Sequence, residues 1–266
     1  MKKIVNIILT IVLIASAIFL LGFAEISHEQ LRCEKVRVNL VIPGEDTIIT
    51  LSELNNLIEN KYGNLKGKEI AQISVEGLRK TILSHPYIDS CEIYLTVNKT
   101  IDITAVQRIP LIQFYNSNNS RYLMGNKGEI MPYPTVRGLN LPVATGMIFD
   151  DFDFDNKPAY SMGQYSKNSG LAGIYHISRQ LEKDDFLKIM IDQIYLNERG
   201  DFELIPKVGT QIILLGDTTH LPAKLTNLKA FYKEIIPKSG WEYYKTVDLR
   251  FDNQVVCIKN SYDGNQ

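Results

Sequence analysis

The sequence predicts an α+β protein in three parts: an N-terminal transmembrane helix, a small β-α-α-β-β domain, and a larger β-rich domain with two helices. Three observations predict this fold class. Residues 4–24 carry no charge, residues 32–109 follow strand and helix periodicities in that order, and residues 110–259 contain mostly short apolar runs separated by turn residues. The composition agrees, because 266 residues with 45% apolar and 22% charged side chains are typical of a globular chain.

The uncharged run at residues 4–24 would span about 31 Å as a helix, which matches the hydrocarbon core of a bilayer. Two lysines precede the run and glutamates follow it. The positive-inside rule therefore places residues 1–3 in the cytoplasm as a short tail and the bulk of the chain on the other side of the membrane.

A cleaved signal peptide is the alternative interpretation of this run. Ala15-Ser16-Ala17 and Gly22-Phe23-Ala24 both place small residues where a signal peptidase reads. The apolar region of a signal peptide usually covers only about 7 to 15 residues. We therefore expect the longer run to be retained as a single-pass anchor.

The first domain after the anchor, residues 32–109, begins with an alternating apolar pattern at residues 35–42 that predicts a half-buried strand. Thr50 and Glu53 then have the spacing of a capping box, in which each side chain satisfies a backbone amide at a helix start. Gly63 is expected to end that helix.

A second helix is expected from Ser74, and Pro86 prevents it from continuing. Residues 87–97 and 100–107 alternate again. The short Asn98-Lys99 link between them predicts an antiparallel hairpin. The expected order of elements in this domain is therefore β-α-α-β-β.

The second domain, residues 110–259, carries mainly strand signals. Strands or short extended segments are expected at residues 111–115, 121–124, 129–131, 141–146, 191–196, 202–205, 211–215, 245–251 and 254–258. Helical spacing occurs at residues 171–181 and 221–236, and residues 150–159 are expected to form a polar loop. Residues 260–266 form a polar tail.

Several segments resemble the exported region of the FtsQ/DivIB cell-division family. In the first domain these are LRKTILSHPYIDSCEIYLTV (78–97) and IDITAVQRIPLI (101–112). In the second domain they are RYLMGNKGEIMP (121–132), LPVATG (141–146), GTQIILLGD (209–217) and TVDLRFDNQVVCIK (246–259). The resemblance implies that the first domain is a POTRA domain and the second an FtsQ-type β-domain. Asn126 departs from the family pattern, where an Asp is common, and the cytoplasmic tail is shorter than in many relatives.

Little in the sequence predicts catalysis or metal binding. The four histidines and three cysteines are scattered, with no paired ligand spacing. Asp151, Asp153 and Asp155 have the spacing of the first ligands of a calcium loop, but Asn156 occupies the place of the required glycine. A net charge of −1 gives no basic surface for nucleic acid. We expect no enzyme activity, no cofactor and no small-molecule substrate.

The resemblance implies a docking site at the C-terminal strands, where members of the family receive a segment of the small division protein FtsB by β-strand addition. Arg250 and Phe251 are expected to close one strand. The expected receiving edge is formed by Asn253, Gln254, Val255, Val256, Cys257 and Ile258. The alternative is that these residues are ordinary strand residues of the core. This applies above all to Val255 and Cys257, whose side chains are expected to face inward.

The resemblance therefore predicts a non-enzymatic scaffold in the bacterial inner membrane that docks late division proteins such as the FtsB/FtsL pair at the septum. Two other functions remain open at this point. One is a POTRA-containing component of envelope export or assembly, and the other is a periplasmic hydrolase with a carboxylate pair that the sequence does not reveal.

Overall fold

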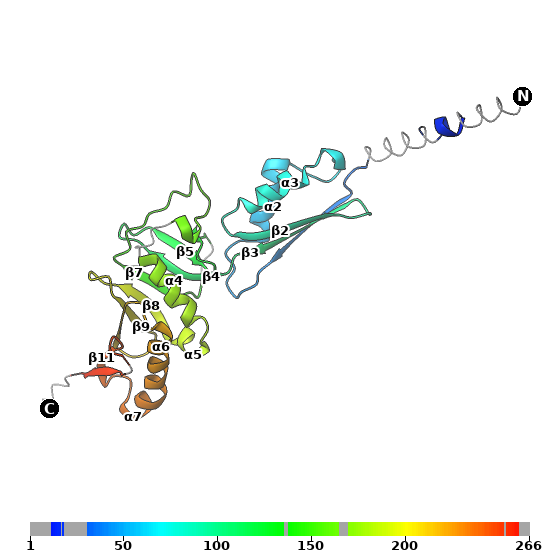
Figure 1. Cartoon of the computed structure of the whole chain (residues 1–266). Helices are drawn as coiled ribbons and strands as arrows, with labels where there is room; N and C mark the ends of the chain where they lie inside the picture. The colour runs from blue at the N-terminus through cyan, green and yellow to red at the C-terminus, as the bar shows by residue number, and fades with distance from the viewer. Residues whose placement is uncertain are drawn as a thin grey trace, which may run out of the picture. The chain divides into compact units, whose positions relative to one another are not determined.

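A computed structural model describes residues 12–16, 18, 31–135, 138–164, 170–252 and 254–260, which divide into two compact units (Figure 1). The first unit contains Ile49–Gln107 and the chain up to Val41. The second contains Ile42–Ile48 and the chain from Arg108 onward. The segment Ile42–Ile48, which the sequence places in the first domain, thus packs with the second unit.

Most of the expected anchor lies outside the described residues. The structure describes only residues 12–16 and 18 of it, and these are helical. Among the residues that the structure describes, no helix combines the length and the apolar character that crossing a bilayer requires.

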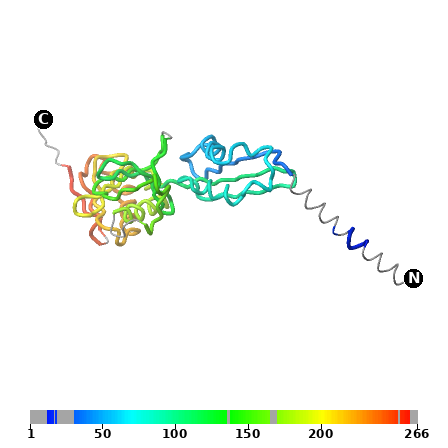
Figure 2. The backbone as a smooth tube through the Cα atoms, turned by 90° about the horizontal axis from the view of Figure 1, so that it is seen from above, coloured from blue at the N-terminus to red at the C-terminus, as the bar shows by residue number. Residues whose placement is uncertain are grey.

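The first unit consists of a three-stranded sheet and two α-helices, drawn in blue, cyan and blue-green in Figures 1 and 2. Its elements are β1 (Lys35–Val41), α2 (Leu51–Tyr62), α3 (Val75–Leu83), β2 (Ile88–Leu95) and β3 (Thr100–Gln107), with a short 3-10 helix at Ile70–Gln72. The strand order is β1-β3-β2, with β1 parallel and β2 antiparallel to β3. The predicted order β-α-α-β-β is confirmed.

The helices of this unit begin where the sequence predicts. The Thr50 hydroxyl accepts a hydrogen bond from the Glu53 amide at 3.2 Å, and the Glu53 carboxylate accepts one from the Thr50 amide at 2.7 Å, which is a complete capping box. Ser74 caps α3 by accepting from the Gly77 amide at 3.0 Å. Gly63 ends α2 with a φ of 62°.

The hairpin between β2 and β3 is longer than predicted. The expected two-residue link Asn98-Lys99 is wrong, because β2 ends at Leu95 and β3 begins at Thr100. A four-residue turn closes instead through a 3.0 Å hydrogen bond from the Lys99 amide to the Thr96 carbonyl. Lys99 takes a φ of 55°, the left-handed conformation that such a turn requires.

The second unit is built on one nine-stranded mixed sheet with the strand order β12-β11-β10-β9-β8-β7-β4-β5-β6. The strands are β4 (Pro110–Tyr115), β5 (Arg121–Gly125), β6 (Ile130–Pro132), β7 (Val143–Gly146), β8 (Ile191–Leu196), β9 (Phe202–Pro206), β10 (Ile212–Gly216), β11 (Tyr244–Asp248) and β12 (Val256–Lys259). The pairs β4–β7, β7–β8 and β10–β11 are parallel, and the others are antiparallel.

Helices pack against this sheet and bury its core. They are α4 (Gly170–Leu181), α5 (Asp185–Met190), α6 (Leu221–Ala230) and α7 (Ile236–Ser239), with a π-helical segment at Phe231–Ile235 and a 3-10 helix at Met162–Gln164. In Figure 1, α4, α5 and α6 lie over one side of the sheet. Ile194, Leu204, Ile213 and Val247 face this side, are fully buried, and form the core with the helices. The α+β class with a β-rich second domain is confirmed.

Three local features of this unit differ from the expectations or add to them. The helix expected over residues 221–236 is found, but its segment Phe231–Ile235 is π-helical and buries both Phe231 and Tyr232. The short helix α5 was not expected, although Asp184 caps it by accepting hydrogen bonds from two backbone amides. The loop at residues 150–159 is not simply polar, because Phe152 and Phe154 pack with the core.

Candidate functional site

Strand β12 lies at one end of the nine-stranded sheet and pairs only with β11 among the described strands. The other end strand, β6, is partly covered, because Ile130 forms a backbone bridge with Tyr160. An end strand with unpaired amides and carbonyls is a template on which another chain can add a strand. The C-terminal end of the sheet therefore offers the more open edge.

The hydrogen bonds of β11 show which of its residues face β12. The Leu249 amide donates to the Leu214 carbonyl at 2.9 Å, so the main-chain groups of Leu249 point toward β10. Because these groups alternate along a strand, those of Asp248 and Thr246 point toward β12. They lie opposite Val256 and Ile258 in the antiparallel register.

The same alternation identifies the open groups of β12. Val256 and Ile258 direct their amides and carbonyls toward β11, and the Asn260 amide continues the pattern by donating to the Tyr243 carbonyl at 3.0 Å. The main-chain groups of Val255, Cys257 and Lys259 therefore point away from the sheet. We call this row of outward amides and carbonyls the open edge.

The side chains of these residues alternate between the two faces of the sheet. Val255 and Cys257 are half-buried and pack against the core under the helices. Val256 and Ile258 lie on the opposite face and are 40% and 58% exposed. The core packing expected as the alternative for Val255 and Cys257 therefore holds for their side chains, while their main-chain groups stay at the edge.

The exposed face beside the open edge carries apolar side chains on β10 and β12. Register pairs place Ile212, Thr246 and Ile258 in one row across β10, β11 and β12, and Leu214, Asp248 and Val256 in the next. Ile212 is 41% exposed and Leu214 half-buried. A strand added at β12 would continue both rows and would place its own side chains beside Val256 and Ile258.

Arg250 and Phe251 do not close a strand, which corrects the prediction. β11 ends at Asp248, whose carboxylate turns the chain by accepting hydrogen bonds from Arg250 at the amide (3.0 Å), Nε (2.9 Å) and Nη2 (2.6 Å). Phe251 follows in the turn with 48% of its side chain exposed. Gln254 is exposed just before β12, which starts only at Val256. Asn253 lies outside the described residues.

The Asp248 carboxylate should make this turn sensitive to acid. The hydrogen bonds from Arg250 lower the pKa of Asp248 below its ordinary value. The ionised carboxylate therefore contributes stability that is complete above the unfolded pKa of about 3.9 and is lost as the pH falls through the lowered native pKa. We expect the free energy of unfolding to fall more steeply below about pH 4 in the native chain than in Asp248→Asn. Equal slopes in acid denaturation would contradict the contribution of Asp248.

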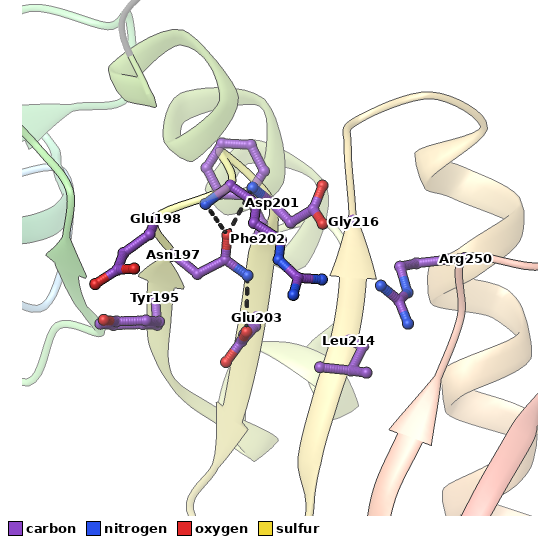
Figure 3. A pocket seen from close by; sticks show the side chains of 10 residues that line it. Tyr195, Asn197, Glu198, Asp201, Phe202, Glu203, Leu214, Gly216 and Arg250 are labelled. Atoms are coloured by element: carbon purple, nitrogen blue, oxygen red, sulfur yellow. Dashed lines mark hydrogen bonds between the residues drawn. The ribbon is translucent and has the colours of Figure 1, made fainter.

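A hollow of about 440 Å³ lies between the β8–β9 turn and Arg250 (Figure 3). Asn197 shapes the turn: its side-chain oxygen accepts from the amides of Arg199 (2.9 Å) and Asp201 (3.1 Å), and its Nδ2 donates to Glu203 at 2.9 Å. The walls carry both acidic and basic groups. The sequence predicted the Gly200-Asp201 turn but not this hollow. The residues that line the hollow come from the ends of four strands, which are brought together only when the sheet forms.

Nothing in the described part of the chain assembles a metal site. No group of three or more His, Cys, Asp or Glu side chains there could hold a metal ion. Asp153 instead accepts hydrogen bonds from the amides of Asp155 and Asn156 (3.1 and 3.3 Å), so it stabilises its own loop. What the terminal strands offer is main-chain hydrogen bonding beside an apolar face.

The two units together define a POTRA-bearing protein whose second domain is a mixed sheet with an open C-terminal strand. A POTRA-like domain model matches residues 31–106, and the model described as FtsQ/DivIB, C-terminal related, matches residues 109–258. The chain belongs to the FtsQ/DivIB family.

One curated relative is the cell division protein FtsQ of Salinibacter ruber (strain DSM 13855 / M31). It is 26% identical over 149 residues, which cover 54% of this chain and 52% of the relative. The match thus spans about half the length of that protein.

Proposed function

We propose that the protein is a non-enzymatic scaffold of the cell-division machinery, anchored in the inner membrane by residues 4–24. In this proposal its C-terminal edge docks FtsB, and through it the FtsB/FtsL pair, at the septum. Membership of the FtsQ/DivIB family and the name of the curated relative support the division role. The family match over residues 109–258 favours it over a general export component that shares only a POTRA domain.

The observation that carries the docking proposal is the open edge of β12 beside an apolar face. Val255, Cys257 and Lys259 present the main-chain groups that a partner strand needs, and Val256 and Ile258 expose apolar surface on the same strand. Phe251 stands in the turn at the start of this strand, where an exposed aromatic side chain can anchor a partner.

Phe251→Ala and Val256→Glu should each weaken binding of the purified exported region of FtsB by about tenfold or more. The first removes an exposed aromatic anchor, and the second places a charge on the apolar face that the partner would cover. Titration calorimetry with the full chain in detergent measures the affinity.

Val208→Glu is the matched control, because Val208 is 49% exposed in the β9–β10 turn, outside the three terminal strands. It introduces the same charge and should leave the affinity unchanged. Thermal unfolding of each variant separates loss of binding from loss of folding. Unchanged affinity in both Phe251→Ala and Val256→Glu would refute the proposed site.

A further inference from the structure

Three segments of the chain meet at one end of the POTRA-like unit: residues 31–35 before and at the start of β1, residues 66–69 after α2, and residues 94–99 at the tip of the β2–β3 hairpin. The Cys33 amide donates to the Lys68 carbonyl at 2.8 Å, and the Glu34 amide donates to the Lys99 carbonyl at 2.9 Å. Figures 1 and 2 show this end of the unit where the described chain enters it. We call it the entry end.

The hairpin tip at the entry end exposes apolar side chains. Val97 is 100% exposed, Tyr94 60% and Leu95 48%. No residue of the unit's core packs against Val97, since a fully exposed side chain has no cover. Polar residues are usual at the apex of a turn, so an exposed apolar residue there indicates contact with an apolar surface outside the unit.

The entry end is also basic, although the whole chain has a net charge of −1. Its three segments contain the basic residues Arg32, Lys35, Lys66, Lys68 and Lys99 and the acidic residues Glu34 and Glu69. Glu34 pairs with Lys99 at 3.2 Å and Glu69 with Arg32 at 3.7 Å, so the surplus positive charge belongs to the other lysines. Lys35 and Lys66 are both exposed.

We propose that the entry end rests on the anionic headgroups of the membrane, with Val97 at the tip entering the interface. The inference rests on the proposed anchor at residues 4–24. Only six residues separate position 24 from Leu31, and even fully extended the seven steps between these two positions span at most about 25 Å. The anchor therefore keeps the entry end within that distance of the bilayer.

The chemistry of the entry end fits a lipid surface. Lysines close to an anionic leaflet are attracted by its negative surface potential, and apolar and tyrosine side chains favour the interface at the headgroup level. Neither interaction alone would hold a domain, but a covalently tethered domain needs little additional affinity to be oriented. The contact would hold the POTRA-like unit end-on to the membrane.

The test uses the full chain reconstituted into vesicles of equal parts phosphatidylcholine and phosphatidylglycerol. Val97→Cys carries an NBD fluorophore in a Cys257→Ala background, because Cys33 and Cys91 are buried and resist labelling. Lipids with a doxyl quencher near the headgroup should remove most of the NBD emission. Ser90→Cys is the matched control: it is exposed on β2, the strand that leads into the hairpin tip, about 23 Å along the chain direction from Val97, and should stay unquenched.

Charge reversal provides a second readout. Lys35→Glu combined with Lys66→Glu should reduce quenching of the Val97 probe in the anionic vesicles, whereas Lys207→Glu, exposed in the second unit, should not. Emission that is shifted to the blue but not quenched by doxyl lipids would show that a protein covers Val97, and would overturn the proposal. Equal quenching at Ser90 would overturn the end-on arrangement.

Flotation of the vesicles separates this inference from the proposed anchor. If the chain floats with the vesicles after an alkaline wash and the Val97 probe is not quenched, the lipid contact is wrong while the anchor stands. If the chain does not float, the anchor is wrong and the lipid contact falls with it. Binding of FtsB at β12 is unaffected by either result.

Discussion

Cys257→Pro should weaken binding of the FtsB exported region by at least about tenfold without unfolding the second unit. The Cys257 amide points away from β11, so proline removes a donor from the open edge and no hydrogen bond from the ladder. A partner strand would then leave a buried carbonyl without its donor, which costs about 1–3 kcal/mol, and would meet the proline ring. Calorimetry on the full chain measures the loss.

Cys257→Ala separates the main chain from the side chain at the same position. It removes the half-buried thiol but keeps the amide, so its affinity should stay within about threefold of the native value. Ile258→Pro is the opposite control, because the Ile258 amide points toward β11 and proline there should lower the melting temperature. If Cys257→Pro and Cys257→Ala bind equally well, strand addition at this edge is wrong.

Gly146→Ala should lower the free energy of unfolding of the second unit by about 3 kcal/mol or more. Gly146 ends β7 with a φ of 106°, and an added Cβ would lie 2.0 Å from the Leu196 carbonyl oxygen. That oxygen belongs to the neighbouring strand β8, so only a shift of the backbone can relieve the clash. The glycine of the LPVATG segment thus permits the close approach of β7 and β8.

Gly200→Ala measures the cost of the positive φ alone, without the clash. Gly200 also has a positive φ, 82°, but an added Cβ meets no atom within 4 Å. Its cost should therefore be limited to conformational strain of about 1 kcal/mol. Urea denaturation of both variants, followed by the fluorescence of Trp241 in the second unit, gives the comparison. Equal destabilisation by the two variants would show that contact with Leu196 does not matter.

The elements of the first unit could be predicted because their signals are local. The capping box of Thr50 and Glu53 and the cap at Ser74 each depend on residues within one helical turn, and both are found in the structure. Strand alternation at residues 35–41 likewise reports one half-buried face. The longer hairpin turn was missed because Lys99 adopts a left-handed conformation, which is uncommon for a lysine and which the sequence does not predict.

The candidate site could be located by sequence but not resolved. The resemblance pointed to residues 250–258, yet it could not show that β11 ends at Asp248, because that depends on the hydrogen bonds that the Asp248 carboxylate accepts from Arg250. Nor could it show which residues of β12 have main-chain groups facing β11 and which have them facing outward. Which main-chain groups lie at the open edge follows from the pairing of β11 with β10, two strands separated by α6 and α7 in the sequence.

The most direct test of docking at β12 is residue-resolved amide hydrogen exchange by NMR, with and without the FtsB exported region. In the free chain the amides of Cys257 and Lys259 should exchange quickly, and those of Val256 and Ile258, which face β11, slowly. On binding, exchange at Cys257 and Lys259 should slow to the rate of their neighbours. Binding that leaves these two amides in fast exchange would contradict strand addition at β12.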